Sequence, residues 1–172
     1  MPTVPTLPGI TSQMIATPRL AMHVLSRGDA GVPVIFLHGN ASSATYWEEI
    51  MLALPAGFRA YAPDLRGYGD SGDKLIDATR GAGDWVDDIL ALLDTLRIDK
   101  AHVVGHSMGG TLVFNLIAAA PARVLSGTVV NPGSPYGFGG SKGLDGTPCY
   151  DDCAGSGGGV VNPDFPKLIA EE

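Results

Sequence analysis

The sequence predicts an α/β protein built on a doubly wound, mostly parallel β-sheet. Two observations lead to this prediction: short apolar runs alternate with segments of helical spacing, and residues 34–37 are apolar at every position. A run without polar positions is typical of a strand that is buried on both faces. The chain has 172 residues, 45% of them apolar, which is enough for one domain with its own core.

The elements of this fold follow in chain order. Residues 19–25 alternate apolar and polar side chains, which indicates a half-buried strand and makes the sheet mixed. Residues 84–96 have apolar side chains at helical spacing, with Asp84 as the expected N-cap. Further strands are expected at 34–37, 58–62, 101–104 and 124–130, and further helices at 46–54 and from Met108 to about residue 120.

Residues 105–110, with the sequence Gly-His-Ser-Met-Gly-Gly, carry the main chemical signal. A strand that turns at once into a helix strains the residue between them, so Gly105 and Gly109 provide the space that Ser107 needs. The helix that begins at Met108 directs its positive end at the serine, and the Met108 N–H can donate to an oxygen that becomes negative during acyl transfer. The pattern predicts a serine nucleophile; a glycine-rich loop with a chance serine is the alternative.

Three motifs, in this order, resemble the α/β-hydrolase family. Residues 34–40, Val-Ile-Phe-Leu-His-Gly-Asn, are similar to the family's third strand and oxyanion loop. Residues 61–72 are similar to its fourth strand and the loop after it. The strand-to-helix turn at residues 105–110, called the Ser107 elbow below, comes next. The resemblance covers about residues 20–132 and implies strands one to six of an α/β-hydrolase core.

The character of the sequence changes after this core. About a third of residues 131–160 are glycine, without apolar periodicity. We therefore divide the chain into 1–132, the N-terminal part of the α/β-hydrolase core, and 133–172, where the resemblance implies the start of a cap or lid; a disordered segment is the alternative. A short helix is expected at 165–169, after a cap and first turn at 162–164. The aromatic residues that could line a pocket mouth are Tyr136, Phe138 and Tyr150.

The resemblance also implies an activity. The oxyanion would be held by the backbone N–H groups of Met108 and Asn40, with His38 and Gly39 supporting the loop and His38 holding it by hydrogen bonds. Serine at position 107 argues against the haloalkane dehalogenase and epoxide hydrolase branches, which use aspartate there. The expected reaction is cleavage of a small ester, lactone or amide through an acyl-enzyme on Ser107. Amidase, peptidase or carbon–carbon bond hydrolase activity uses the same parts, and a non-catalytic ligand-binding protein on a truncated scaffold is the rival hypothesis.

The base and the acid of a catalytic triad are not apparent. Histidine is the usual base for serine, but no histidine follows Ser107 in the chain. In the family, none of the four that precede it lies on the loop that brings the base to the serine, and Asn131 at the end of the sixth strand cannot supply a carboxylate. The histidines with expected structural roles are His23, His38, His102 and His106. Among the acidic residues, solvated turns are expected to hold Asp145, Asp151 and Asp152. Asp64 and Asp70 are expected to hydrogen-bond turn amides, with Arg66 as a partner.

A second polypeptide is expected to complete the protein. Without strands seven and eight of the family fold, the strand at 124–130 would end the sheet as an apolar parallel edge, which promotes aggregation. We therefore expect a heterodimer in which a complementary C-terminal chain carries the catalytic histidine and the Asp or Glu. Cleavage of a precursor within the cap, a split gene and an experimental cut are the alternative origins.

Charge and hydropathy exclude two classes of partner. The net charge is −7, with 11 basic residues scattered among 18 acidic ones, so we expect no binding of nucleic acid. No apolar run approaches the roughly 18 residues of a membrane helix, and residues 1–10 lack the features of a secretory signal. We expect a cytoplasmic protein that acts on a small-molecule acyl substrate and does not bind a membrane.

The two cysteines do not indicate a metal site. Cys149 and Cys153 are expected as reduced thiols, with a local disulfide as the alternative. Two thiols without a nearby histidine make a poor zinc site, because structural zinc usually takes four ligands. We expect neither a metal nor another cofactor.

Overall fold

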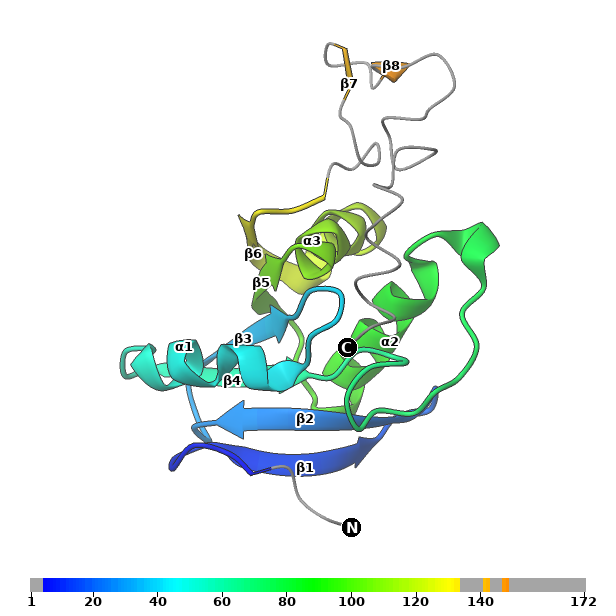
Figure 1. Cartoon of the computed structure of the whole chain (residues 1–172). Coiled ribbons are helices and arrows are strands. Elements are labelled where there is room, and N and C mark those ends of the chain that lie inside the picture. The colour runs from blue at the N-terminus through cyan, green and yellow to red at the C-terminus, as the bar shows by residue number, and fades with distance from the viewer. Residues whose placement is uncertain (1–4, 134–140, 143–146, 149–172) are drawn as a thin grey trace, which may run out of the picture. The chain divides into compact units, whose positions relative to one another are not determined.

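A six-stranded sheet forms the first of two units of the chain, Met1–Pro132; the second unit is Gly133–Glu172. The computed structural model, shown in Figure 1, describes residues 5–133, 141–142 and 147–148. The strand order is β1-β2-β4-β3-β5-β6, for strands β1 Thr11–Ala16, β2 Ala21–Arg27, β3 Val32–Leu37, β4 Phe58–Pro63, β5 Ala101–His106 and β6 Val124–Val130. The three pairs formed by β3 to β6 are parallel, and β2 is antiparallel to both β1 and β4. The predicted mixed, mostly parallel sheet is confirmed.

The helices differ from prediction mainly at their starts. They are η1 Ala44–Trp47, α1 Glu48–Ala53, η2 Ala78–Arg80, α2 Gly83–Thr95, α3 Met108–Ala119 and η3 Pro121–Arg123. The helix expected at 46–54 is a 3₁₀ turn followed by a short α-helix. The expected N-cap Asp84 is wrong: Ala82 is the N-cap of α2 and has no capping side chain, and Asp84 lies in the first helical turn.

Alternate residues of the central strand face two different apolar clusters. Ile35 and Leu37 of β3 belong to the cluster with the buried residues of α2 and α3. Val34 and Phe36 belong to the cluster with Trp47 of η1 and the buried part of α1. Because successive strand side chains point to opposite faces, this alternation places helices on both sides of the sheet, as the doubly wound class requires.

Strand β6 is an edge of the sheet and has little cover. It pairs with β5 on one side only, and every position after Val124 is exposed. On β6 the Leu125 side chain is 47% exposed, and on the adjacent helix α3 the Ile117 side chain is 38% exposed. Within the described residues the edge is therefore apolar and parallel, as the sequence predicts.

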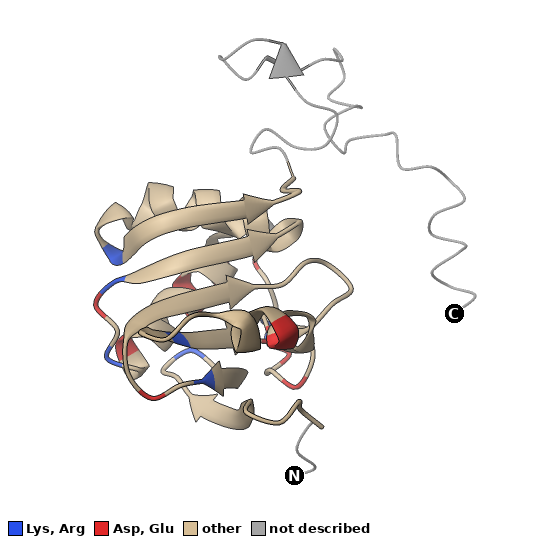
Figure 2. Ribbon diagram, turned by 90° about the vertical axis from the view of Figure 1, so that its left-hand side faces the viewer, with Lys and Arg blue, Asp and Glu red and all other residues tan. Residues whose placement is uncertain are grey.

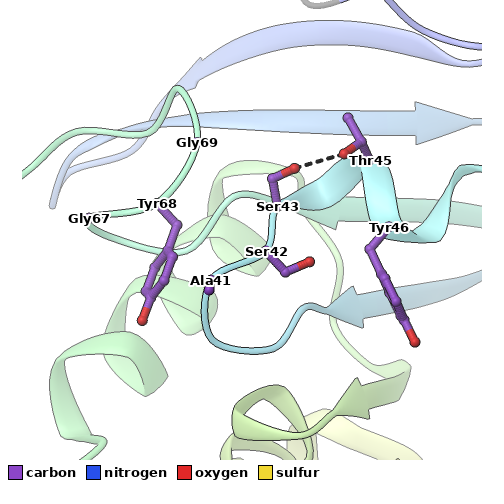
Figure 3. Close-up of a pocket in the computed structure, with 8 residues that line it drawn as sticks. All are labelled: Ala41, Ser42, Ser43, Thr45, Tyr46, Gly67, Tyr68 and Gly69. Carbon is purple, nitrogen blue, oxygen red and sulfur yellow. Dashed lines mark hydrogen bonds between the residues drawn. The ribbon is translucent and has the colours of Figure 1, made fainter. Parts of the chain in front are cut away.

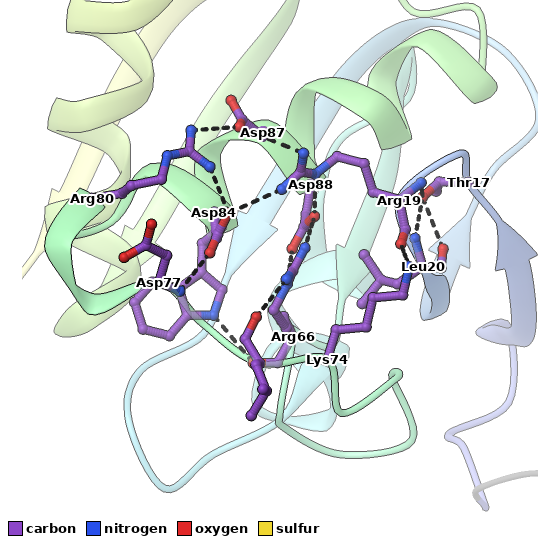
Figure 4. A network of polar contacts seen from close by, with 12 residues as sticks. Thr17, Arg19, Leu20, Arg66, Lys74, Asp77, Arg80, Asp84, Asp87 and Asp88 are labelled. Atoms are coloured by element: carbon purple, nitrogen blue, oxygen red, sulfur yellow. Dashed lines mark hydrogen bonds and ion pairs between the residues drawn. The ribbon is translucent and has the colours of Figure 1, made fainter.

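A network of ion pairs ties the loop after β4 to helix α2 (Figure 4). The Asp88 carboxylate, 1% exposed, accepts two hydrogen bonds of 2.7 Å from Arg66 and one of 2.6 Å from Arg19. Next to it, the Asp77 N–H and the neighbouring arginines lower the pKa of Asp84. Arg66 therefore pairs with Asp88, and its predicted pairing with Asp64 or Asp70 is wrong.

Apart from this network, charged residues lie on several elements of the described part. Figure 2 shows basic and acidic positions spread over several elements of the ribbon. Four arginines, Arg19, Arg66, Arg80 and Arg123, are ion-paired with aspartates. In this part of the chain no group of three or more potential metal ligands gathers, and no helix there has the length and apolar character needed to cross a membrane.

The second unit contributes two short described strands. Strands β7 Ser141–Lys142 and β8 Thr147–Pro148 pair in antiparallel fashion. The other predictions for this unit concern residues outside the described ones: the aromatic residues of the expected lid, the two cysteines, the three turn aspartates and the helix at 165–169.

Candidate active site

Ser107 lies at the junction of β5 and α3 in a strained backbone conformation. Its φ is 53° and its ψ is −117°, a combination that residues with a Cβ rarely adopt and that costs about 1–3 kcal/mol. Hydrogen bonds hold it on both sides: the Ser107 N–H donates to the Val130 carbonyl at 3.0 Å, and the Ser107 carbonyl accepts from the Thr111 N–H at 3.2 Å. The residue is half-buried, so the strand-to-helix turn presents it at the carboxyl end of the parallel strands.

Close backbone approaches explain the glycines around the serine. A Cβ on Gly105 would lie 2.2 Å from the Gly109 carbonyl oxygen, and one on Gly109 would lie 2.1 Å from the Leu37 carbonyl oxygen. Both distances are shorter than any normal contact of a Cβ atom. A Cβ on Gly39 would lie 3.1 Å from the Ser107 Cβ. The end of β3 and the elbow are thus packed backbone to backbone, and Gly39 lies against the serine.

His38 is buried and fixes the loop after β3. Its Nε2 accepts a hydrogen bond from the Leu65 N–H at 3.0 Å, so the proton is on Nδ1, which donates to the Gly39 carbonyl at 2.8 Å. Burial lowers the pKa of His38, against the opposing effects of the Gly39 carbonyl and Asp64. The neutral ring is therefore a structural link between the loops after β3 and β4, and both of its nitrogens are occupied.

The two predicted oxyanion donors, Met108 and Asn40, directly follow Ser107 and Gly39, the two residues that pack against each other. Met108 is the first residue of α3, where backbone N–H groups have no acceptor within the helix. Asn40 follows Gly39, and its side-chain Oδ1 accepts a 2.6 Å hydrogen bond from the Tyr68 hydroxyl. The Tyr68 hydroxyl also lies 3.7 Å from the Met108 Sδ. The role of the Met108 and Asn40 N–H groups in holding an oxyanion stays a prediction.

The buried Asp64 carboxylate links several segments around the site by hydrogen bonds. Its Oδ1 accepts from the Ala44 N–H at 2.7 Å, and its Oδ2 from the Asp70 N–H at 3.0 Å and from His23 at 2.7 Å. The Ser12 hydroxyl lies 2.8 Å from the other nitrogen of His23. As predicted, Asp64 binds turn amides, and its lone pairs are committed to this structural role.

The remaining histidines also have partners other than the serine. His102, at the far end of β5, forms a 2.7 Å hydrogen bond with Ser126. His106 stacks on Tyr46, with ring centroids 4.9 Å apart and planes 20° from parallel, and its buried Nδ1 has no partner among the described residues. Among the described residues, the side-chain hydrogen bonds of His23, His38 and His102 do not involve Ser107.

An open pocket of about 590 Å³ lies beside the loop that follows Asn40 (Figure 3). Two tyrosines, Tyr46 from η1 and Tyr68 from the loop after β4, stand on its two sides, and small polar residues lie between them. The described residues that line it are Ala41, Ser42, Ser43, Thr45, Tyr46, Gly67, Tyr68 and Gly69.

A comparison with known families supports the interpretation of this geometry. The sequence profile of the family described as alpha/beta hydrolase fold matches residues 32–143. That range includes the loop at Gly39 and the elbow at Ser107. The chain belongs to the α/β-hydrolase fold family.

Individual α/β-hydrolase relatives show how much of the fold is present. The chain is 37% identical to an epoxide hydrolase of Caballeronia sordidicola, over 67% of this chain and 35% of the relative. It is 36% identical to 2-hydroxymuconate semialdehyde hydrolase of Pseudomonas sp. strain CF600, over 55% and 34% respectively. A solved structure of a Vigna radiata epoxide hydrolase mutant superposes with a TM-score of 0.66 at 33% identity, over 72% of this chain and 39% of that one. The chain thus spans about a third of the length of the curated relatives that it matches.

Sequence reasoning missed the aromatic part of this α/β-hydrolase site. Tyr68 falls within the motif at 61–72, where it was assigned no role, and Tyr46 was assigned only to a helix. The structure brings both to the loop after Asn40. Their positions depend on contacts with His38 in the loop after β3 and with His106 at the end of β5, which no local sequence signal reveals.

Proposed function

We propose that this chain is the nucleophile-bearing part of a serine hydrolase that cleaves a small ester, lactone or amide. The observation that carries the proposal is the conformation of Ser107, at φ 53° between β5 and α3 with the Gly39 loop packed against it. A structure keeps a strained serine between glycines only where the surroundings enforce it, and such strain is typical of functional sites. Residues 133–172 are proposed as the start of a cap.

The proposed reaction has two steps through a covalent intermediate. The Ser107 Oγ bonds to the acyl carbon while its proton passes to a histidine, and the carbonyl electron pair moves onto the oxygen. The N–H groups of Met108 and Asn40 stabilise this oxyanion. The oxyanion then collapses and expels the alcohol or amine, which takes the proton from the histidine. Water repeats the sequence on the acyl-enzyme and releases the acid.

We propose that the histidine and its acid come from outside residues 1–172, on a complementary C-terminal chain. The contacts of the four histidines support this proposal, since His23, His38 and His102 are hydrogen-bonded elsewhere and His106 is stacked on Tyr46.

Carbon–carbon bond hydrolysis is the second candidate function. It is favoured by the similarity to 2-hydroxymuconate semialdehyde hydrolase, and it can use the same serine and oxyanion donors. Epoxide hydrolysis fits the chemistry less well despite the similarity to epoxide hydrolases. Attack of Ser107 on an epoxide carbon would leave an ether, which has no carbonyl carbon for water to attack, so the enzyme could not be regenerated. A non-catalytic binding protein is the remaining alternative.

The experiment is labelling and turnover in the purified complex of this chain with its complementary chain. A fluorophosphonate probe is expected to label Ser107, and Ser107→Ala is expected to abolish labelling and to lower hydrolysis of p-nitrophenyl acetate by several orders of magnitude. The matched control is Ser26→Ala, which changes a half-buried serine on β2, three strands away from β5 in the sheet. Activity of Ser107→Ala within tenfold of the parent would place the nucleophile elsewhere. A complex that the probe does not label would favour the binding protein.

A further inference from the structure

The two tyrosines that line the pocket of Figure 3 contact the residues before and after Ser107. One of its walls, Tyr46, stacks on His106, which precedes the serine. The other, Tyr68, contacts Met108, which follows it, through its hydroxyl at 3.7 Å from the Sδ. Ser107 itself does not line the pocket, but both aromatic walls contact the residues that flank it in the chain.

Both aromatic walls are held in place before any ligand binds. Tyr46 is fixed by its stack on His106 and by an edge contact with Trp47 at 5.0 Å, yet 49% of it is exposed. Tyr68 donates its hydroxyl proton to Asn40 and lies edge-on to His38 at 5.2 Å. Side chains that are already ordered lose little entropy on binding, so their surfaces are efficient contacts.

The surface between the walls is polar but uncharged. The hydroxyls of Ser43 and Thr45 lie 2.8 Å apart and share one hydrogen bond, which leaves one hydroxyl proton of the pair for another acceptor. Ser42 adds a further hydroxyl. None of the lining residues in the described part of the chain is charged.

We propose that this pocket binds a neutral planar ring bearing an oxygen substituent, as part of the ester, lactone or amide that Ser107 cleaves. The proposal rests on the proposed function. A planar ring gains the offset-stacking energy that a saturated ring lacks against Tyr46. The serine and threonine hydroxyls bind the oxygen substituent, whereas a carboxylate there would lose hydration without gaining a cation.

The test measures kcat/KM for esters matched in everything except planarity, on the complex with the complementary chain. Ethyl phenylacetate is compared with ethyl cyclohexylacetate, which varies the acyl side, and benzyl acetate with cyclohexylmethyl acetate, which varies the alcohol side. The planar member of at least one pair is expected to react roughly three- to tenfold faster, the range that aromatic stacking provides. No preference in either pair would overturn the proposal.

Two variants locate the preference. Tyr46→Leu is expected to abolish it, because the side chain keeps bulk but loses the flat face, and Tyr46→Phe is expected to retain it. The preference is the ratio of two kcat/KM values measured in the same variant, so a general effect of either substitution on the reactivity of Ser107 cancels in it. If Tyr46→Leu keeps the preference, or Tyr46→Phe loses it, the ring does not bind by stacking on Tyr46.

A second substrate pair tests the absence of charge. Ethyl 3-hydroxyphenylacetate is expected to exceed ethyl 3-carboxyphenylacetate by at least about tenfold in kcat/KM, and equal rates would contradict a neutral ligand. Ser107→Ala separates the two levels of the hypothesis. If it leaves ester hydrolysis at the parental rate, the proposed function fails; if it abolishes hydrolysis but the parent shows no planar preference, only the inference about the pocket fails.

Discussion

At the scale of single residues, the site combines backbone strain with side chains that have no freedom. Ser107 is held at φ 53° by hydrogen bonds to Val130 and Thr111, so the conformation is imposed by the strand and the helix that flank it. His38, neutral and bonded at both nitrogens, holds the neighbouring loop in the same way. Backbone strain of this kind lowers the free energy of unfolding, and here it accompanies the presentation of the Ser107 hydroxyl.

Replacement of Ser107 by glycine should therefore stabilise the protein while removing its nucleophile. Glycine relieves about 1–3 kcal/mol of strain but raises the entropy of the unfolded chain by up to about 1 kcal/mol, so we expect a net gain of about 1 kcal/mol. Urea unfolding measures the free energy of unfolding. Ser107→Ala is the control, because it removes the hydroxyl but keeps the Cβ and hence the strain. Equal stabilities of the two variants would show that Ser107 is unstrained.

At the scale of elements, the sequence predicts what is local and misses what depends on distant partners. The strand at 124–130 is found with its predicted bounds, because four of its seven residues are β-branched and a proline lies on either side of it, a signal that needs no partner to be recognised. The strand β1 was not predicted, since its six residues are mostly exposed and become a strand only by pairing with β2.

The same limit applies to the candidate site. The Ser107 elbow and the Gly39 loop follow from short motifs, because glycines mark each close backbone approach. The partner of Arg66 does not, because Asp88 is 22 residues away on α2 and a nearer carboxylate, Asp64, is already occupied by amides. Polar pairing inside a fold is decided by which side chains the packed elements bring together, and that information is absent from local sequence.

The Arg66–Asp88 pair should be the strongest polar link between the loop after β4 and α2. Asp88→Ala leaves the buried Arg66 guanidinium without its carboxylate, so we expect a loss of about 3–5 kcal/mol in the free energy of unfolding. The matched control is Asp87→Ala on the same helix. Asp87 is 37% exposed, and solvent screens its ion pairs with Arg19 and Arg80, so its loss should be much smaller. Comparable losses would mean that burial does not decide the strength of this network.

At the scale of the whole molecule, the sheet has two unlike edges. Strand β1 is antiparallel and has only exposed and intermediate positions, whereas β6 is parallel and carries exposed apolar residues next to an α3 face that is also partly uncovered. Antiparallel edges commonly tolerate solvent on one face, but parallel strands are normally covered on both. The β6 edge is therefore where we place the complementary chain of the proposed function.

A charge on the β6 edge should oppose both aggregation and assembly. Leu125, 47% exposed, lies near the start of β6, at the opposite end of the strand from Ser107. In the chain 1–172 produced alone, Leu125→Lys is expected to raise the soluble fraction and lower light scattering, because lysine on an edge strand blocks further pairing. Mixed with the complementary chain, the same variant should form less complex and recover less Ser107-dependent ester hydrolysis. Met14→Lys, a comparable change at a 41% exposed position of β1, should alter neither property. If both variants behave alike, or Leu125→Lys assembles as well as the parent, the second polypeptide does not dock on β6.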